Sequence, residues 1–185
     1  MKRFELKVLD QHWISKNPND KTDLCSHGQI ELRIGDQLIS DENDDDWTIS
    51  TSGLMLLRTL NLDHAGDGMK PIILHCGMLS MLGCPICIDW SIEHKNDLVI
   101  IKNAKKIPSV NEKEVIHFPI GEVKIERVQY IREIIRFCDE IKGFFKDKPR
   151  DFSEEYEKNE WINFWSEFDR LLGKNRDELK SKKNT

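Results

Sequence analysis

Residues 85–102, PICIDWSIEHKNDLVIIK, decide the fold class of this chain. The first half of the stretch alternates apolar and polar side chains, which is typical of a β-strand with one buried face. The apolar set is Ile86, Ile88, Trp90 and Ile92, and the residues on the other face are Cys87, Asp89, Ser91 and Glu93. The polar segment 94–97 predicts a turn into the apolar run of residues 98–101. The stretch therefore predicts a β-hairpin in the middle of the chain.

The same alternation occurs twice nearer the N-terminus. Residues 4–8 and 30–34 place apolar side chains at every second position, and each segment predicts a strand. The Gly-Asp pair at 35–36 favours a tight turn into the next apolar pair, which makes another hairpin. A short helix is expected after this hairpin, with its N-cap at Ser50, Thr51 or Ser52.

Helical periodicity replaces the alternation in the last third of the chain. Apolar residues recur at three- and four-residue steps from 128 to 145 and predict a long amphipathic helix, and Pro149 breaks the helical pattern after it. A second helix is predicted from a capping box at Asp151 and Glu154 to a glycine C-cap at Gly173. Its apolar stripe consists of Trp161, Phe164, Trp165, Phe168, Leu171 and Leu172.

These elements predict an α+β fold, since strands come first and helices last. An antiparallel or mixed β-sheet from the first two-thirds is packed by the short internal helix and the two C-terminal amphipathic helices. The 185 residues suit a single domain that needs neither disulfides nor a metal to fold. Within it we expect a β-rich part with one short helix (1–121), a two-helix part (122–174) and a flexible basic tail (175–185).

Composition narrows the classes of partner. The net charge of -5 argues against a nucleic-acid binder that relies on neutralising phosphates. The chain contains no apolar run of the ~20 residues that a membrane helix needs and no export signal. We therefore predict a cytoplasmic protein that binds no membrane. Its five cysteines are then expected to be reduced.

Three of those cysteines allow three interpretations. Cys84 and Cys87 have the C-x₂-C spacing of a zinc site. Residues that could complete such a site are Cys76, its neighbour His75, Cys25 and His27. The stretch CPIC also resembles the CPxC motif of glutaredoxin-like proteins, although no βαβ pattern surrounds it. The favoured interpretation is that the thiols are buried as small apolar groups, so that no cofactor is predicted and zinc is the alternative.

Two further clusters are candidate partner-binding surfaces. The acidic run contributes Asp41, Asp44, Asp45 and Asp46, and it lacks the glycine and glutamate of a calcium loop. Trp161 and Trp165 are the aromatic residue type that binding hot spots favour, and they also suit a homodimer seam. No catalytic signature is present, and the glycine-rich segment His64–Gly68 indicates at most a small-molecule binder.

Four stretches carry a resemblance: DLCSHGQIEL, DWTISTSGLMLLRTL, LHCGMLSMLGCP and IDWSIEH. They resemble a group of small uncharacterised bacterial proteins of unknown function, which implies a bacterial origin and carries over no functional residues. The sequence as a whole predicts a non-enzymatic protein-interaction protein. One form of this hypothesis is an immunity-type protein that neutralises a basic toxin. The rival is a zinc-containing enzyme or zinc-stabilised module that uses Cys84 and Cys87.

Overall fold

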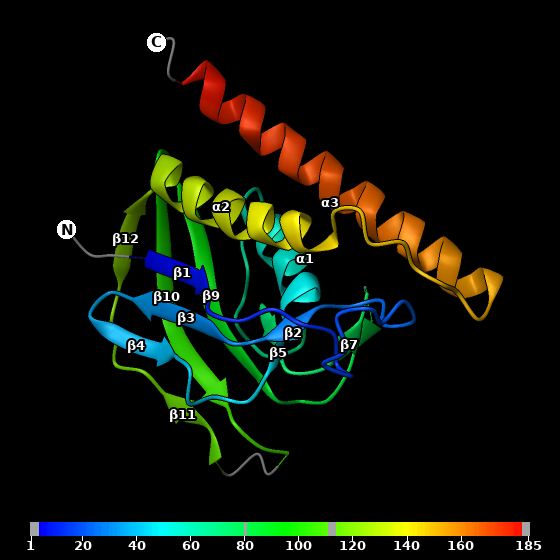
Figure 1. Cartoon of the computed structure of the whole chain (residues 1–185). Coiled ribbons are helices and arrows are strands. Elements are labelled where there is room, and N and C mark those ends of the chain that lie inside the picture. The colour runs from blue at the N-terminus through cyan, green and yellow to red at the C-terminus, as the bar shows by residue number, and fades with distance from the viewer. Residues whose placement is uncertain (1–3, 80, 111–113, 183–185) are drawn as a thin grey trace.

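The computed structural model describes residues 4–79, 81–110 and 114–182, and it has the predicted α+β class (Figure 1). Every strand pairing between described residues is antiparallel. In chain order the elements are β1 (Phe4–Val8), β2 (His27–Gly28), β3 (Ile30–Ile34), β4 (Gln37–Ser40), β5 (Trp47–Thr48), α1 (Ile49–Thr59), β6 (Ile73–Leu74), β7 (Gly77–Met78), β8 (Met81–Leu82), β9 (Cys87–Lys95), β10 (Leu98–Ile107), β11 (Ile116–His117), β12 (Val123–Glu126), α2 (Arg127–Phe145) and α3 (Glu155–Ser181).

Both predicted hairpins are confirmed. The central one is β9–β10, which forms the middle of a five-stranded sheet with β6 beside β9 and with β11 and β12 beside β10. The other is β3–β4, which joins β1 in a three-stranded sheet. Gly35 allows the tight turn between β3 and β4 because its φ of 62° lies in the left-handed region.

The face of β9 that was expected to be polar is buried at its start. Cys87 is 1% exposed and Asp89 is fully buried, although their positions alternate with the core isoleucines. The segment after α1 covers Asp89 on this face: His64 Nε2 lies 2.7 Å from its carboxylate, and the N–H of Gly68 donates to it at 2.9 Å. The backbone groups of His64 also pair with those of Ile92 at the edge of the strand. Gly66 comes so close that a Cβ there would lie 2.5 Å from the backbone nitrogen of Ser91 on β9. Alternation therefore identified the strand, but it could not show that part of the second face is also buried.

The three helices and the sheets share one core. Helix α2 packs on β1 and β12 and also contacts α1 and α3, and Figure 1 shows α3 lying across the outer side of α2. The rings of Phe4, Trp90 and Tyr130 meet in this core and have no exposed surface. Their centroids are 6.1 Å apart for Phe4–Trp90 and 4.9 Å apart for Phe4–Tyr130. No helix within the described ranges is both long and apolar enough to cross a membrane.

The predicted start of α1 is wrong by a few residues. The helix begins at Ile49, and its N-cap is Thr48, whose side chain makes no capping hydrogen bond. The serines expected to cap it lie buried within its first turn and bond to neighbouring segments instead. Ser50 accepts the backbone N–H of Ser26 at 3.1 Å, and Ser52 accepts that of Leu74 at 3.1 Å.

The expected end of α3 at Gly173 is also wrong, because the helix continues to Ser181. Asn175 is fully buried and donates its amide to the carbonyl of Leu171 at 2.8 Å, and Glu178 forms a two-pronged ion pair with Arg127. These contacts hold residues that were assigned to a flexible tail, and 183–185 lie outside the described residues.

Two smaller expectations in this part of the chain need correction. The predicted capping box at Asp151 does not form, since Glu157 instead accepts the backbone N–H and the hydroxyl of Ser153. Strand β12 lies within the range 122–174 that was assigned to two helices alone. Its four residues pair with β10, and so a long-range partner decides their conformation.

Candidate functional site

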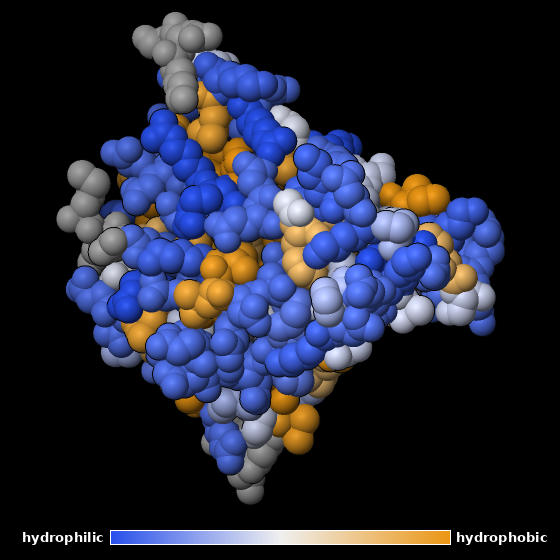
Figure 2. Space-filling model, in the orientation of Figure 1, coloured by the Kyte–Doolittle hydropathy of each residue, from blue (hydrophilic) through white to orange (hydrophobic). Residues whose placement is uncertain are grey.

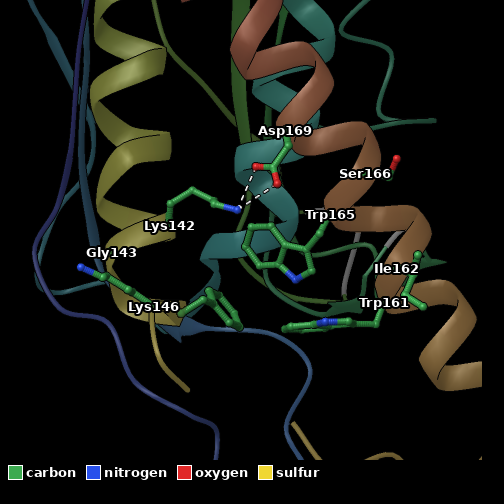
Figure 3. A pocket seen from close by; sticks show the side chains of 9 residues that line it. Lys142, Gly143, Lys146, Trp161, Ile162, Trp165, Ser166 and Asp169 are labelled. Atoms are coloured by element: carbon green, nitrogen blue, oxygen red, sulfur yellow. Dashed lines mark hydrogen bonds and ion pairs between the residues drawn. The ribbon is translucent and has the colours of Figure 1, made fainter. Parts of the chain in front are cut away.

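A groove of about 720 Å³ lies between the end of α2 and the first half of α3 (Figure 3). Helix α2 contributes Lys142 and Phe145, and α3 contributes Trp161, Ile162 and Trp165. Residues four apart on a helix share a face, so Trp161 and Trp165 lie one above the other along the groove. The structure thus brings the two predicted tryptophans together in one cavity.

The aromatic stripe of α3 passes from the core to the surface. Phe168 has no exposed surface, and its ring centroid lies 5.0 Å from that of Trp165. Trp165 in turn lies 5.5 Å from Trp161, and both tryptophans are only partly buried. Ile162 beside them is 53% exposed, and Figure 2 shows isolated apolar side chains within the hydrophilic surface over the amino-terminal half of α3. The stripe is therefore core at one end and accessible surface at the other.

One ion pair spans the groove. Lys142 on α2 lies 2.8 Å from Asp169 on α3, and its ammonium group is 4.7 Å from the ring centroid of Trp165 (Figure 3). The pair is exposed on both sides, so it contributes only ~0.2–1 kcal/mol to stability. The ion pair also fixes the position of the Lys142 ammonium group beside the indole of Trp165.

Positive charge gathers at the end of α2 beyond this pair. Lys146 is exposed and has no ion-pair partner within the part of the chain that the structure describes. Lys148 lies 3.5 Å from the ring centroid of Phe144, and the guanidinium of Arg150 lies 3.9 Å from that of Trp13. Burial, and then the charge of Arg150, lowers the pKa of Lys148. This end of an acidic chain is therefore locally basic and aromatic.

The predicted acidic surface is not part of the groove. Asp41, Asp44, Asp45 and Asp46 lie between β4 and β5, away from α3 (Figure 1). Asp44 pairs with the ammonium group of Lys106, and Asp46 lies 3.2 Å from Nε2 of His12. Asp41 accepts a backbone N–H at 2.9 Å, a hydrogen bond that lowers its pKa. Asp45 lines a cavity of about 210 Å³ beside Lys106. The run is largely engaged within the molecule.

Three of the six candidate metal ligands converge, and among them only Cys84 belongs to the C-x₂-C pair. The nitrogen or sulfur ligand atoms of His75, Cys76 and Cys84 all lie within 4.8 Å of one another. Both cysteines are partly exposed. Burial, together with a hydrogen bond to the thiol of Cys76, raises the pKa of Cys84. Among the residues that the structure describes, this is the group whose donor atoms suit a metal ion.

The other three candidate ligands lie elsewhere. Cys87 faces the interior, where burial and the charge of Asp89 raise its pKa to about 11. Cys25 is 2% exposed and accepts the backbone N–H of Leu79. His27 lies 3.4 Å from a carboxylate oxygen of Asp23. Cys84 therefore lies beside Cys76 and His75, and its spacing partner in the sequence, Cys87, is not part of the cluster.

Sequence reasoning missed a histidine–carboxylate pair. His64 Nε2 lies 2.7 Å from Asp89, which is fully buried and also accepts the backbone N–H of Gly68. Asp63 is adjacent to His64 in the sequence, yet it bonds to His94 instead. His64 lines a cavity of about 560 Å³. Only the contact between the segment after α1 and β9 could have indicated this pair.

No protein-family model, curated protein or solved structure matches this chain. The resemblance to a group of small bacterial proteins therefore stays a prediction, and function has to be argued from the geometry.

Proposed function

We propose that this chain is a non-enzymatic protein-interaction module that binds a partner segment in the groove between α2 and α3. One observation carries the proposal. An aromatic stripe that is otherwise core ends in two partly exposed tryptophans across an open cavity of about 720 Å³. Tryptophan is enriched among the residues that dominate binding energy at interfaces.

The groove favours an apolar anchor. Trp161, Trp165 and Phe145 form an aromatic wall, and Ile162 stands exposed at its edge. The volume lies within the range of about 300–1,000 Å³ that is common for binding cavities. Burying a large apolar side chain there is worth roughly 1.5–3 kcal/mol. A phenylalanine, leucine or methionine of the partner would gain this energy without disturbing the core beneath.

The charges around the groove favour an acidic flank on that partner segment. Lys146 has no ion-pair partner in the described part of the chain, whereas Lys142 at the wall is already paired with Asp169. Complementary charge raises the association rate and selects among partners. The partner chemistry that fits is therefore an apolar anchor followed by aspartate or glutamate.

The toxin-neutralising form of the hypothesis changes accordingly. In the acidic run that would attract a basic toxin, Asp44 is paired with Lys106 and Asp46 lies 3.2 Å from Nε2 of His12. A toxin bound by this chain would instead present an acidic and apolar segment to α3. Deleting this gene in the native host should then leave the partner harmful to the cell.

Site-specific photocrosslinking tests the proposal. A photoreactive amino acid replaces Ile162 in the groove, and the matched control replaces Ile116, which is also an exposed isoleucine but lies on β11. The same partner should be captured in the native host through position 162 alone. The crosslinked peptide should be apolar and acidic, and K146E should reduce its capture.

Two outcomes would contradict the proposal. One is capture of the same proteins at positions 162 and 116, which indicates nonspecific adhesion. The other is a crosslink between two copies of this chain at position 162, which makes the groove a homodimer seam.

A further inference from the structure

We infer that His75, Cys76 and Cys84 form a three-ligand site for a soft divalent cation, Zn²⁺, with a fourth position open to a cavity. The site is independent of the α2–α3 groove. It differs from the C-x₂-C arrangement that the sequence suggests, because Cys87 takes no part in it and His75 replaces it.

The backbone path brings the three ligands together. His75 and Cys76 directly precede β7, and Cys84 follows β8 by two residues. The antiparallel β7–β8 hairpin returns the chain on itself, so its two ends meet. Cys84 Sγ lies 3.4 Å from His75 Nδ1. Zn–N and Zn–S bonds of about 2.0–2.1 and 2.3 Å place neighbouring ligand atoms about 3.5–3.8 Å apart in a tetrahedron. The remaining ligand atoms lie within 4.8 Å of one another, so a contraction of at most about 1 Å would complete the site.

Backbone contacts already support the sulfur of Cys76. The N–H of Cys84 donates to it at 2.8 Å, and the N–H of Gly83 donates to the Cys76 carbonyl at 3.1 Å. A Cβ at position 83 would lie 2.4 Å from that sulfur, so this close approach of the backbone to Cys76 requires glycine. The position of His75 is fixed as well, since its carbonyl accepts the hydroxyl of Thr48.

The exposure of the thiols separates this pair from the structural cysteines. Cys25, Cys87 and Cys138 are each at most 2% exposed, as expected of small apolar core residues. Cys76 and Cys84 remain partly exposed and therefore accessible to an ion. Two thiolates and one imidazole are soft or borderline ligands, which suit Zn²⁺ rather than Mg²⁺ or Ca²⁺.

Of the three proposed ligands, Cys84 borders a cavity of about 570 Å³. Cys84 lines this cavity together with Gly68, Leu74 and Pro85. Zinc sites with three protein ligands hold water or an exogenous ligand in the remaining position. The arrangement therefore allows a water molecule or a small anion to reach the ion.

The first test measures metal binding by the full chain. Protein purified without chelators, stripped and then titrated with Co²⁺, should bind one equivalent with thiolate-to-cobalt charge-transfer absorption, and Zn²⁺ should displace it. C84S, C76S and H75N should each weaken binding by at least about 100-fold. Loss of a residue that only supports a ligand costs up to about 100-fold in metal affinity, and loss of a ligand itself should cost at least as much. C87S is the matched control and should leave affinity unchanged. G83A should also weaken binding, because it displaces the sulfur of Cys76.

A second measurement needs no variant and covers the case in which a substitution prevents folding. Zn²⁺ should slow alkylation of Cys76 and Cys84 in the native chain, mapped by mass spectrometry, and should leave the other three thiols unchanged. The inference is overturned if Zn²⁺ protects neither thiol, if the cobalt complex lacks thiolate absorption, or if C87S rather than C76S abolishes binding.

Discussion

Cys84 and Cys87 are three residues apart in the sequence but lie in opposite environments. Cys87 begins strand β9, where it pairs with β6 and β10 and is 1% exposed. Cys84 lies before the strand, partly exposed and next to His75 and Cys76. The difference shows that the role of a thiol here depends on which element holds it. The C-x₂-C spacing alone does not show which cysteine lies on a strand and which lies in a loop.

The tryptophans show the same contrast. Trp90 on β9 is fully buried and its ring packs on Phe4, whereas Trp161 on α3 is partly exposed at a groove. The residue type is the same, but one side chain stabilises the fold and the other remains available for binding. Substitutions can test whether the two regions are as different as the structure indicates.

The largest effect is expected at Trp90. W90A should lower the free energy of unfolding by ~3–5 kcal/mol, because it leaves a cavity in the core. W161A should cost only about 1 kcal/mol, which is near the centre of the range for single substitutions. Urea unfolding of both variants measures the difference. Equal losses would mean that the groove is part of the core.

The two cysteines should differ next. In metal-free protein, C87S should cost about 1–3 kcal/mol, since it buries a hydroxyl without an assured partner. C84S should change stability by less than about 0.5 kcal/mol, as expected of a partly exposed position. Thermal unfolding in the presence of a chelator compares the two. A larger loss for C84S would reverse the assignment of which thiol is structural.

Alkaline pH should expose the buried thiol. Burial raises the pKa of Cys87 from 9.0 to about 11, so the unfolded chain releases this proton at a lower pH than the folded chain. The contribution of Cys87 to stability is therefore complete below pH 9 and is lost as the pH rises through about 11. Burial also raises the pKa of Cys25 and Cys138. The difference in slope between wild type and C87A isolates Cys87, and parallel slopes would contradict the prediction.

The smallest effect is expected at the ion pair across the groove. K142M should cost ~0.2–1 kcal/mol, because both charges are exposed, and this loss should shrink in about 1 M salt. K146M is the control, since Lys146 has no ion-pair partner among the described residues. Urea titrations at low and high salt measure both. A salt-independent loss in K142M would indicate packing rather than charge.

Much of the fold is predictable from local patterns. Alternation identified β3–β4 and β9–β10, and three-four periodicity identified α2, because each pattern reports one buried face. The same logic failed where burial came from a distant segment. Asp89 is polar and was expected on an exposed face, yet His64 and Gly68 cover it. Strand β12 was missed because its alternation lasts only four residues before helix α2 begins.

The candidate sites were predictable to a similar extent. The i,i+4 spacing of Trp161 and Trp165 was sufficient to place them together on one face. The packing of α3 on α2 places Lys142 and Phe145 in the same groove as the two tryptophans, and the sequence did not indicate this packing. The acidic residues were expected to share in partner binding, but Lys106 and His12 approach them from other parts of the chain.

By itself, the sequence determined the α+β class, the two hairpins and the aromatic stripe. These features follow from local periodicity, which shows which side chains share one face of a strand or helix. Only the tertiary structure decided that Cys84 meets Cys76 and His75, and that Cys87 does not join them. The physical reason is that Cys87 belongs to strand β9, where it pairs with β6 and β10 and is 1% exposed. The β7–β8 hairpin instead brings residues that are eight or nine positions apart next to one another.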